Sequence, residues 1–326
     1  MTLSCRVRLE DVTWLKIAKA MNLSNFMQHF PDEESCEIYL KSFREKTGVR
    51  CKSCQSVTKH YWFSGGKFFE CSKCRRRSSL KSGTVMENSK LPLQLWLLAL
   101  LLVSATKKGF SCLEFQRHLG LSRYATAFRL MHKIRVYMGK REALYTLSDM
   151  IEYDDCFVTV ATKKSEIGKL KRGKGSQRKA SVAVAAESVP VENPETGKSG
   201  KVCGYFKMEV LGKVDRDHVN RFIKKNTVGD IALFTDKNTA YVDIKDIVET
   251  HFTVVSGKDA TNDTLRWVHK AISNLKRKLL GINHMITYKY LQNYLNEFVY
   301  KLNRRYFGDR LFDRLVLASI YPYVQS

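Results

Sequence analysis

Four cysteines in two Cys-x-x-Cys pairs form the clearest chemical pattern in this sequence. Cys51 and Cys54 make the first pair, Cys71 and Cys74 make the second, and an aromatic stretch with Gly65-Gly66 lies between them. Each pair can form a tight turn, and four thiolates complete a tetrahedral zinc shell that leaves no position for water. We therefore predict a structural Zn²⁺ held by a ribbon whose hairpin turns at the two glycines.

Three arginines follow the second cysteine pair directly. Arg75, Arg76 and Arg77 carry positive charge of the kind that contacts DNA phosphates. The sequence leaves two interpretations of the ribbon open, DNA contact and a folding element alone, and both can hold together.

Acidic residues in the second half are the next candidates for chemistry. Residues 150–161, MIEYDDCFVTVA, are typical of a strand, and alternation places Glu152 and Asp154 on one face and Asp155 on the other. Residues 230–236, DIALFTD, are typical of a buried strand that ends in an aspartate.

That second aspartate is Asp236. In a mixed sheet with this order of elements the first and fourth strands can be neighbours, which would bring Asp154 and Asp236 together. Two converging carboxylates make a site for hard divalent cations. Two such cations can stabilise the attacking and leaving oxygens of an in-line phosphoryl displacement.

A histidine and a lysine share one stripe of a helix expected over residues 266–281. Its apolar residues recur at a spacing of three and four, and Gly281 is expected to end it. His269 and Lys276 lie two turns apart and could present a metal or phosphate ligand with a phosphate clamp. From the helix alone, a packed or surface histidine and a solvated lysine are the favoured interpretation.

The elements around these residues indicate an α/β domain. Three strands with meander spacing precede a helix over 216–226, the strand that ends in Asp236, a helix over 238–249, a short strand and the late helices. A basic loop at residues 162–179 follows the first strand and suits phosphate contacts. The cations we assign to these contacts are Lys171, Arg172 and Lys174.

The region before this domain is expected to be helical. Residues 91–105 are too short and too interrupted for a membrane span and indicate a core helix. Helices over 111–118 and 123–138, joined by a turn with a glycine, match the outline of a helix-turn-helix or of any small helical bundle. Its candidate DNA contacts are Arg123, Arg129 and Lys133. The predicted divisions are an extension (1–23), a short helix with the ribbon (24–82), the helical region (88–140) and the catalytic domain (148–326).

The charge balance sets the class of partner. Lys and Arg number 56 against 32 Asp and Glu in 326 residues, a formal net charge of +24. Nucleic acid is the first partner to expect, because no long basic amphipathic segment supports a membrane surface. The start of the chain lacks the apolar core of a secretion signal, and nine cysteines then predict reduced thiols in a cytoplasmic protein.

From about residue 24 onward, these motifs resemble a known family. The second half is similar to the ribonuclease-H-like catalytic domain of bacterial insertion-sequence transposases of the DDE superfamily. The group that it resembles has an N-terminal zinc ribbon and a third catalytic residue (Glu, Asn or His) followed seven residues later by Lys. The matching motifs are IEYDDCFVTV, LFTDKNTAY, RWVHKAISNLKRKLLG, YLQNYLNEFVYKLNRR and, before the ribbon, FPDEESCEIYLKSFREKTGVRCKSC.

The resemblance implies a role for each motif residue. Asp154, Asp236 and His269 take the three catalytic positions, Lys276 is the following lysine, and Asp155 stands where many members have Glu. The implied fold is a ribonuclease-H-like mixed sheet with flanking helices. The implied cofactor is Mg²⁺ or Mn²⁺, and the implied partner is double-stranded DNA, bound by a homo-oligomer because two element ends are joined. The implied reaction nicks those ends and transfers the 3′-hydroxyl into target DNA.

The histidine in the third position leaves its chemistry open. Imidazole suits Mn²⁺ better than Mg²⁺, so His269 either ligates the second metal or holds a metal-bound water or a phosphate oxygen. Two other functions compete with transposition: a DNA-binding protein without catalysis, and a structure-selective nuclease of the same fold. The intact set of four residues weighs against the first, and a strand-transfer product would exclude the second.

Overall fold

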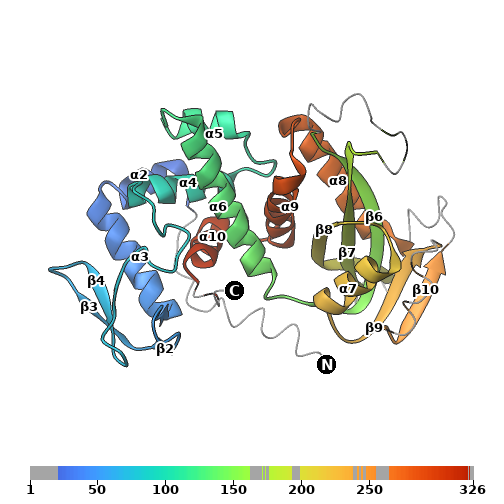
Figure 1. Cartoon of the computed structure of the whole chain (residues 1–326), viewed down its shortest axis with the longest axis horizontal. Coiled ribbons are helices and arrows are strands. Elements are labelled where there is room, and N and C mark those ends of the chain that lie inside the picture. Colours follow the sequence, from blue (N-terminus) through green and yellow to red (C-terminus); the bar gives the residue numbers. More distant parts are fainter. Residues whose placement is uncertain are drawn as a thin grey trace. The chain divides into compact units, whose positions relative to one another are not determined.

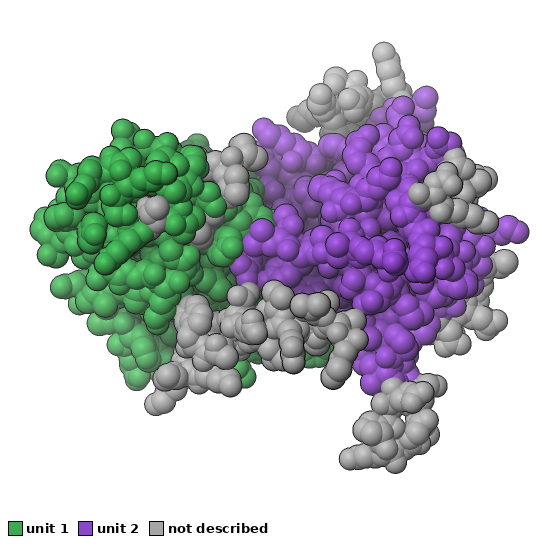
Figure 2. Space-filling view, turned by 90° about the horizontal axis from the view of Figure 1, so that it is seen from below, with its two compact units in different colours: residues 1–140, 304–326 green, residues 141–303 purple. Residues whose placement is uncertain are grey.

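The computed structural model describes residues 21–161, 171, 173, 176–192, 199–237, 241, 244, 247–254, 264–321 and 323. The extension over 1–20 lies outside them. The chain divides into two compact units (Figure 2). The first unit combines Met1–Lys140 with Arg304–Ser326, and the second unit is Arg141–Asn303.

The first unit begins with two helices where the sequence suggested one. They are α2 (Leu23–His29) and α3 (Glu33–Thr47). Pro31 lies between them. Proline has no N–H and is disfavoured inside a helix, which explains why the chain forms two helices here. Asp32 caps α3 through its side chain, while the acidic residues of the first turn are the two glutamates that follow it.

Short antiparallel strands form the ribbon. The strands are β1 (Val49–Arg50), β2 (Val57–Thr58), β3 (His60–Phe63), β4 (Phe68–Cys71) and β5 (Arg77–Ser79). β1 pairs with β2, and β3, β4 and β5 make a three-stranded sheet. The predicted hairpin joins β3 to β4 through Gly65-Gly66. A Cβ on Gly66 would lie 2.3 Å from the Phe68 ring, so a larger residue would displace that ring.

Three helices follow the ribbon in the first unit. They are α4 (Leu93–Ala105), α5 (Cys112–His118) and α6 (Tyr124–Glu142). The helix α4 is a buried core helix, as expected. No helix in the described ranges has both the length and the apolar character needed to cross a membrane.

The C-terminal segment Arg304–Ser326 groups with the first unit, whereas the sequence analysis placed it with the domain over 148–326. The helix α10 (Leu311–Ile320), preceded by the 3₁₀ turn η5 (Gly308–Arg310), packs against α3 and α4. Phe312 is buried beside the ring of Tyr39. The Tyr39 hydroxyl donates a 2.8 Å hydrogen bond to Asp313. The residues of α10 are mostly apolar, but their composition does not reveal which core they join.

The second unit is built on a five-stranded mixed sheet of the ribonuclease-H type. Its strands are β6 (Leu147–Thr159), β7 (Lys179–Glu192), β8 (Ser199–Leu211), β9 (Thr227–Asp236) and β10 (Thr250–Val254). The order is β10-β9-β6-β7-β8. β6, β7 and β8 form the expected antiparallel meander, and β9 runs parallel to both β6 and β10. The first and fourth strands of this unit are therefore neighbours, as predicted.

Helices cover both faces of this sheet (Figure 1). α8 (Arg266–Ile282) and α9 (Tyr288–Asn303) bury their apolar stripes on one face. α7 (Arg216–Asn226) packs on the other, with Phe222 beside Tyr153. Alternation along β6 thus sends Tyr153 toward α7 and its neighbours in sequence toward α8.

One helix prediction lies mostly outside the described residues, and another differs from the structure by one residue at its end. The helix expected over 238–249 falls largely outside the described residues, and Tyr241 and Ile244 there lie in 3₁₀ geometry. Gly281 does not end α8, which continues to Ile282 and closes with the Asn283 N–H on the Leu279 carbonyl.

Replacing Tyr39 with Phe tests the assignment of α10 to the first unit. Burial raises the pKa of Asp313, and Tyr39→Phe removes a hydrogen-bond donor from this buried carboxyl group. We expect the free energy of unfolding of the first unit to fall by about 1–3 kcal/mol in urea denaturation. The control Tyr306→Phe, at a side chain that is 77% exposed, should change little. Equal stability of the two variants would contradict this packing.

Candidate active site and metal centre

The four ribbon cysteines come together as the sequence predicted. The sulfurs of Cys51, Cys54, Cys71 and Cys74 all lie within 4.8 Å of one another. The Cys51–Cys74 pair is 3.4 Å apart and the Cys54–Cys71 pair 3.8 Å. Zn–S bonds of about 2.3 Å place tetrahedral sulfurs about 3.8 Å apart, so the cluster fits a structural zinc ion.

The arginines of the ribbon lie at its surface. Arg75 and Arg77 each approach Glu70 at 3.4 Å, yet their side chains stay 75% and 68% exposed. Arg76 is exposed as well. Exposed ion pairs are weak, so the guanidinium groups of these arginines remain available to bind a partner. Their contact with DNA stays a prediction.

The candidate DNA contacts outside the ribbon divide into three groups. Arg123 and Arg129 are exposed at α6, and Lys171 is exposed in the basic loop. Arg172 and Lys174 lie outside the described residues. Lys133 is half-buried, donates to the Glu87 carbonyl at 2.8 Å, and has a pKa lowered by burial. One of the three donors of its ammonium is therefore engaged inside the first unit.

The two aspartates of the second unit occupy matching positions on neighbouring strands. β6 and β9 pair in parallel, with Ile151 opposite Leu233 and Glu152 opposite Phe234. Two residues further along each strand stand Asp154 and Asp236, the latter at the end of β9. Their alignment follows from register alone, because parallel strands advance together.

His269 joins this pair from α8. Its Nε2 lies 3.2 Å from Asp154 Oδ2, and the two side chains are 29% and 18% exposed. The hydrogen bond to Asp154 is the main cause that raises the pKa of His269, against the opposing effect of burial. The charges of Glu152 and Asp236 raise this pKa further. The ring therefore sits in a field of three carboxylates.

Lys276 lies further along the same helix. Its side chain is exposed, and its charge acts on Cys156, two residues past Asp154 on β6. The helical stripe proposed from sequence thus runs beside β6. Within the described ranges the four cysteines are the only set of three or more His, Cys, Asp or Glu groups with ligand atoms within 4.8 Å. The direct His269–Asp154 contact is consequently a pair and not a closed ligand set.

Glu152 has a role that sequence reasoning missed. Its Oε2 accepts hydrogen bonds from the backbone N–H groups of Trp267 and Val268 at 2.7 and 3.1 Å. These groups open α8, whose own N-cap residue, Leu265, provides no side-chain bond. Glu152 is fully buried, and burial raises its pKa. The only signal available beforehand was its shared face with Asp154.

Asp155 lies on the opposite face of β6, as the alternation of side chains predicted. It accepts a 2.5 Å hydrogen bond from the Tyr241 hydroxyl. Tyr241 follows Asp236 by five residues and is itself buried. This bond ties the segment after Asp236 to the strand that carries Asp154.

The comparisons with protein families bear on this arrangement directly. Residues 146–303 match the model of the ISXO2-like transposase domain, and residues 31–77 match that of the transposase zinc-ribbon domain. The second unit is thus similar to an ISXO2-like transposase domain, and the ribbon to a transposase zinc ribbon. A comparison with curated proteins finds no match. The matched residues 146–303 coincide closely with the second unit, Arg141–Asn303. Both end at residue 303, before the C-terminal helix α10, which packs in the first unit.

Loss of one ribbon cysteine should release the zinc. We expect Cys54→Ser to reduce bound zinc from one ion per chain to a small fraction, since three thiolates no longer close the tetrahedral shell. Metal analysis after dialysis against a weak chelator measures this. The control Cys112→Ala, whose sulfur contacts Met131 and not the cluster, should keep its zinc. Full zinc content in Cys54→Ser would contradict the assignment.

The start of α8 should loosen when Glu152 loses its acceptor oxygens. In Glu152→Leu we expect faster hydrogen exchange at the start of α8 in the transposase domain, and a loss of about 2 kcal/mol of unfolding free energy. Glu152→Gln keeps an acceptor oxygen, so it should lie between Glu152→Leu and the parent protein. Unchanged protection of this segment in Glu152→Leu would show that the two hydrogen bonds do not hold the helix.

Proposed function

We propose that this protein is a DNA transposase that nicks the ends of an insertion sequence and transfers the resulting 3′-hydroxyl into target DNA. The observation that carries the proposal is the alignment of Asp154 and Asp236 on neighbouring strands, with His269 directly on Asp154. The match of the second unit to a transposase domain supports it. A net charge of +24 suits a polyanionic substrate.

The donors of this site fit divalent ions in kind. Carboxylate oxygens suit Mg²⁺ and Mn²⁺, and an imidazole adds a ligand that Mn²⁺ accepts more readily. Asp154 and Asp236 would hold the ions, with His269 completing or supporting the second position. When bound, the ions supply Lewis-acid stabilisation to an in-line phosphoryl displacement.

The protein's own side chains have distinct tasks in this proposal. Asp154 and Asp236 lie on the rigid sheet, which keeps the distance between their carboxylates fixed while the bound DNA reacts. Lys276 is exposed two turns beyond His269 on α8, where its ammonium can pair with a phosphate as a point charge. The hydrogen bond to Asp154 raises the pKa of His269, which favours the protonated ring beside that carboxylate.

Two further parts of the proposal follow from the chemistry. Joining two element ends at one target calls for two catalytic domains, so we propose a homo-oligomer on DNA. The zinc ribbon and the α5–α6 pair supply exposed cations for double-stranded DNA, namely Arg75, Arg76, Arg77, Arg123 and Arg129. The substrate places the reaction in the bacterial cytoplasm, on the nucleoid.

Asp154→Asn tests the reaction. We expect strand transfer of a labelled element end into a target plasmid to fall by at least about a thousandfold, because a neutral amide is a poor ligand for a hard cation. The control Asp149→Asn lies on the same strand, is exposed, and has a left-handed backbone (φ 63°) that asparagine tolerates.

The control should keep parental activity. Strand transfer by Asp154→Asn at the parental rate would refute the assignment. Hydrolysis of the end without any transfer by the parent protein would replace the transposase with a nuclease, and DNA binding with neither reaction would leave a DNA-binding protein.

A further inference from the structure

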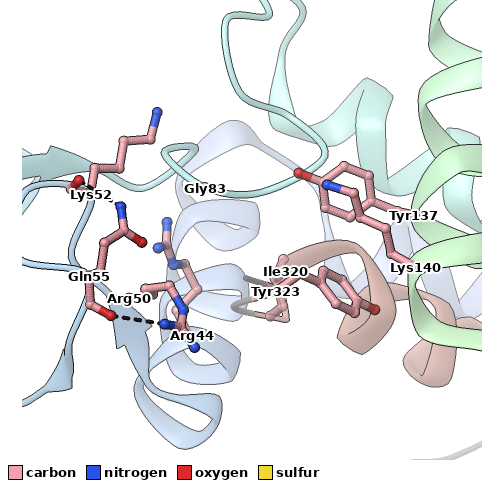
Figure 3. A pocket seen from close by; sticks show the side chains of 9 residues that line it. All are labelled: Arg44, Arg50, Lys52, Gln55, Gly83, Tyr137, Lys140, Ile320 and Tyr323. Carbon is pink, nitrogen blue, oxygen red and sulfur yellow. Dashed lines mark hydrogen bonds between the residues drawn. The ribbon is translucent and has the colours of Figure 1, made fainter. Parts of the chain in front are cut away.

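A hollow in the first unit is lined by basic and aromatic side chains that the proposed function does not use. It is shallow and open to solvent. Figure 3 shows Arg44 and Arg50 on one side and Tyr137 and Lys140, from α6, on the other. The two walls are far apart in the sequence, so residue spacing alone does not predict the hollow.

Arg44 is the unusual member of this lining. Its side chain is 4% exposed, and burial lowers its pKa to about 10. One terminal nitrogen donates to the carbonyl oxygens of Ser79 and Leu80, whereas Nε has no hydrogen-bond partner. No described carboxylate lies within ion-pair distance of Arg44. A buried cation without a counter-charge is costly, and a bound anion would offset that cost.

The other walls add positive charge to the lining. Arg50 donates to the Gln55 carbonyl at 2.9 Å, and the Lys140 ammonium lies 4.8 Å from the Tyr137 ring centre. A fourth cation, Lys52, is paired with Glu87 and is already compensated. Among the residues that the structure describes, no carboxylate lines the hollow. Arg44, Arg50 and Lys140 therefore line an open hollow whose described lining contains no acidic side chain.

We propose that this hollow binds a backbone phosphate of DNA. The inference rests on the proposed function, since it takes DNA as the polyanion. Arginine offers planar, paired donors that match phosphate oxygens, and Arg44 and Arg50 supply two such groups beside one another (Figure 3). Openness to solvent favours a phosphodiester within a long strand, because a strand can pass over the hollow while one phosphate enters it.

The tyrosines shape the far wall for this ligand. The rings of Tyr137 and Tyr323 meet edge to face at 5.8 Å, and the Tyr323 hydroxyl donates to the Ala318 carbonyl. Burial raises the pKa of Tyr137, so its hydroxyl stays protonated and remains a donor. The wall thus offers donors and apolar surface but no negative charge.

The test is the salt dependence of DNA binding by the full-length protein. A fluorescent duplex is titrated at several salt concentrations with the parent protein and with the double variant Arg50→Gln/Lys140→Gln. We expect weaker binding to every duplex sequence and a slope of log affinity against log salt that is smaller by about 1, as for one lost phosphate contact. Both side chains are only half-buried, so the fold should persist. The single variant Lys140→Gln should reduce the slope by a smaller amount.

A matched control separates the hollow from charge in general. Lys41→Gln/Lys59→Gln removes the same number of charges, at positions in the same unit that do not line the hollow. A slope change that is equal in the control and in Arg50→Gln/Lys140→Gln would overturn the proposal. So would an unchanged slope in Arg50→Gln/Lys140→Gln.

Inorganic phosphate distinguishes the two sources of this anion. If phosphate alone raises the melting temperature of the parent protein but not of Arg50→Gln/Lys140→Gln, while both bind DNA with the same slope, the hollow takes free phosphate and the DNA assignment fails. A reduced slope in a protein that performs no strand transfer would leave this inference standing and remove only the transposase function.

Discussion

Two backbone N–H groups at the start of α8 donate to one buried carboxylate on β6, and the geometry of the candidate active site depends on that interaction. Glu152 accepts both hydrogen bonds and lies two residues before Asp154 on the same face of the strand. His269 lies one residue after the second donor, Val268. The helix and the strand are therefore fixed to each other within a few ångströms of the Asp154–His269 contact. The positive end of the helix dipole stabilises the buried carboxylate in return.

The rest of the second unit supports this junction from both sides. Behind α8, the apolar stripe that includes Leu275 and Leu279 packs on β6 and β7, so the helix cannot rotate without opening the core. On the other face, the Tyr241–Asp155 hydrogen bond holds the segment that follows Asp236. Parallel pairing of β6 with β9 sets the remaining distance, and a slip of one residue would move one aspartate to the opposite face.

Local chemistry explains what the sequence could predict. Cysteine spacing identified the zinc ribbon, and alternation identified the opposite faces of Asp154 and Asp155. Asp215 caps α7, and the predicted bounds of that helix, 216–226, agree with the structure because its signals are local. The neighbouring positions of Asp154 and Asp236 followed from the order of strands, which limits the possible topologies.

Tertiary packing explains what the sequence missed. Lys133 is predicted to contact DNA because it is a cation on the second helix of the pair, and its hydrogen bond to the Glu87 carbonyl was not predictable from its place in the sequence. The helix α10 is apolar enough for either core, so nothing in its composition assigned it to the first unit. Glu152 and Arg44 gained their roles from groups more than thirty residues away, which no spacing in the chain reveals.

Anomalous X-ray diffraction from crystals of the full-length protein bound to element-end DNA and Mn²⁺ tests the central claim most directly. The account predicts manganese density between the carboxylates of Asp154 and Asp236, at about 2.0–2.6 Å from their oxygens. His269 should then have left Asp154 for the metal, its water or a phosphate oxygen. Manganese bound elsewhere, with the His269–Asp154 contact intact beside the scissile phosphate, would contradict it.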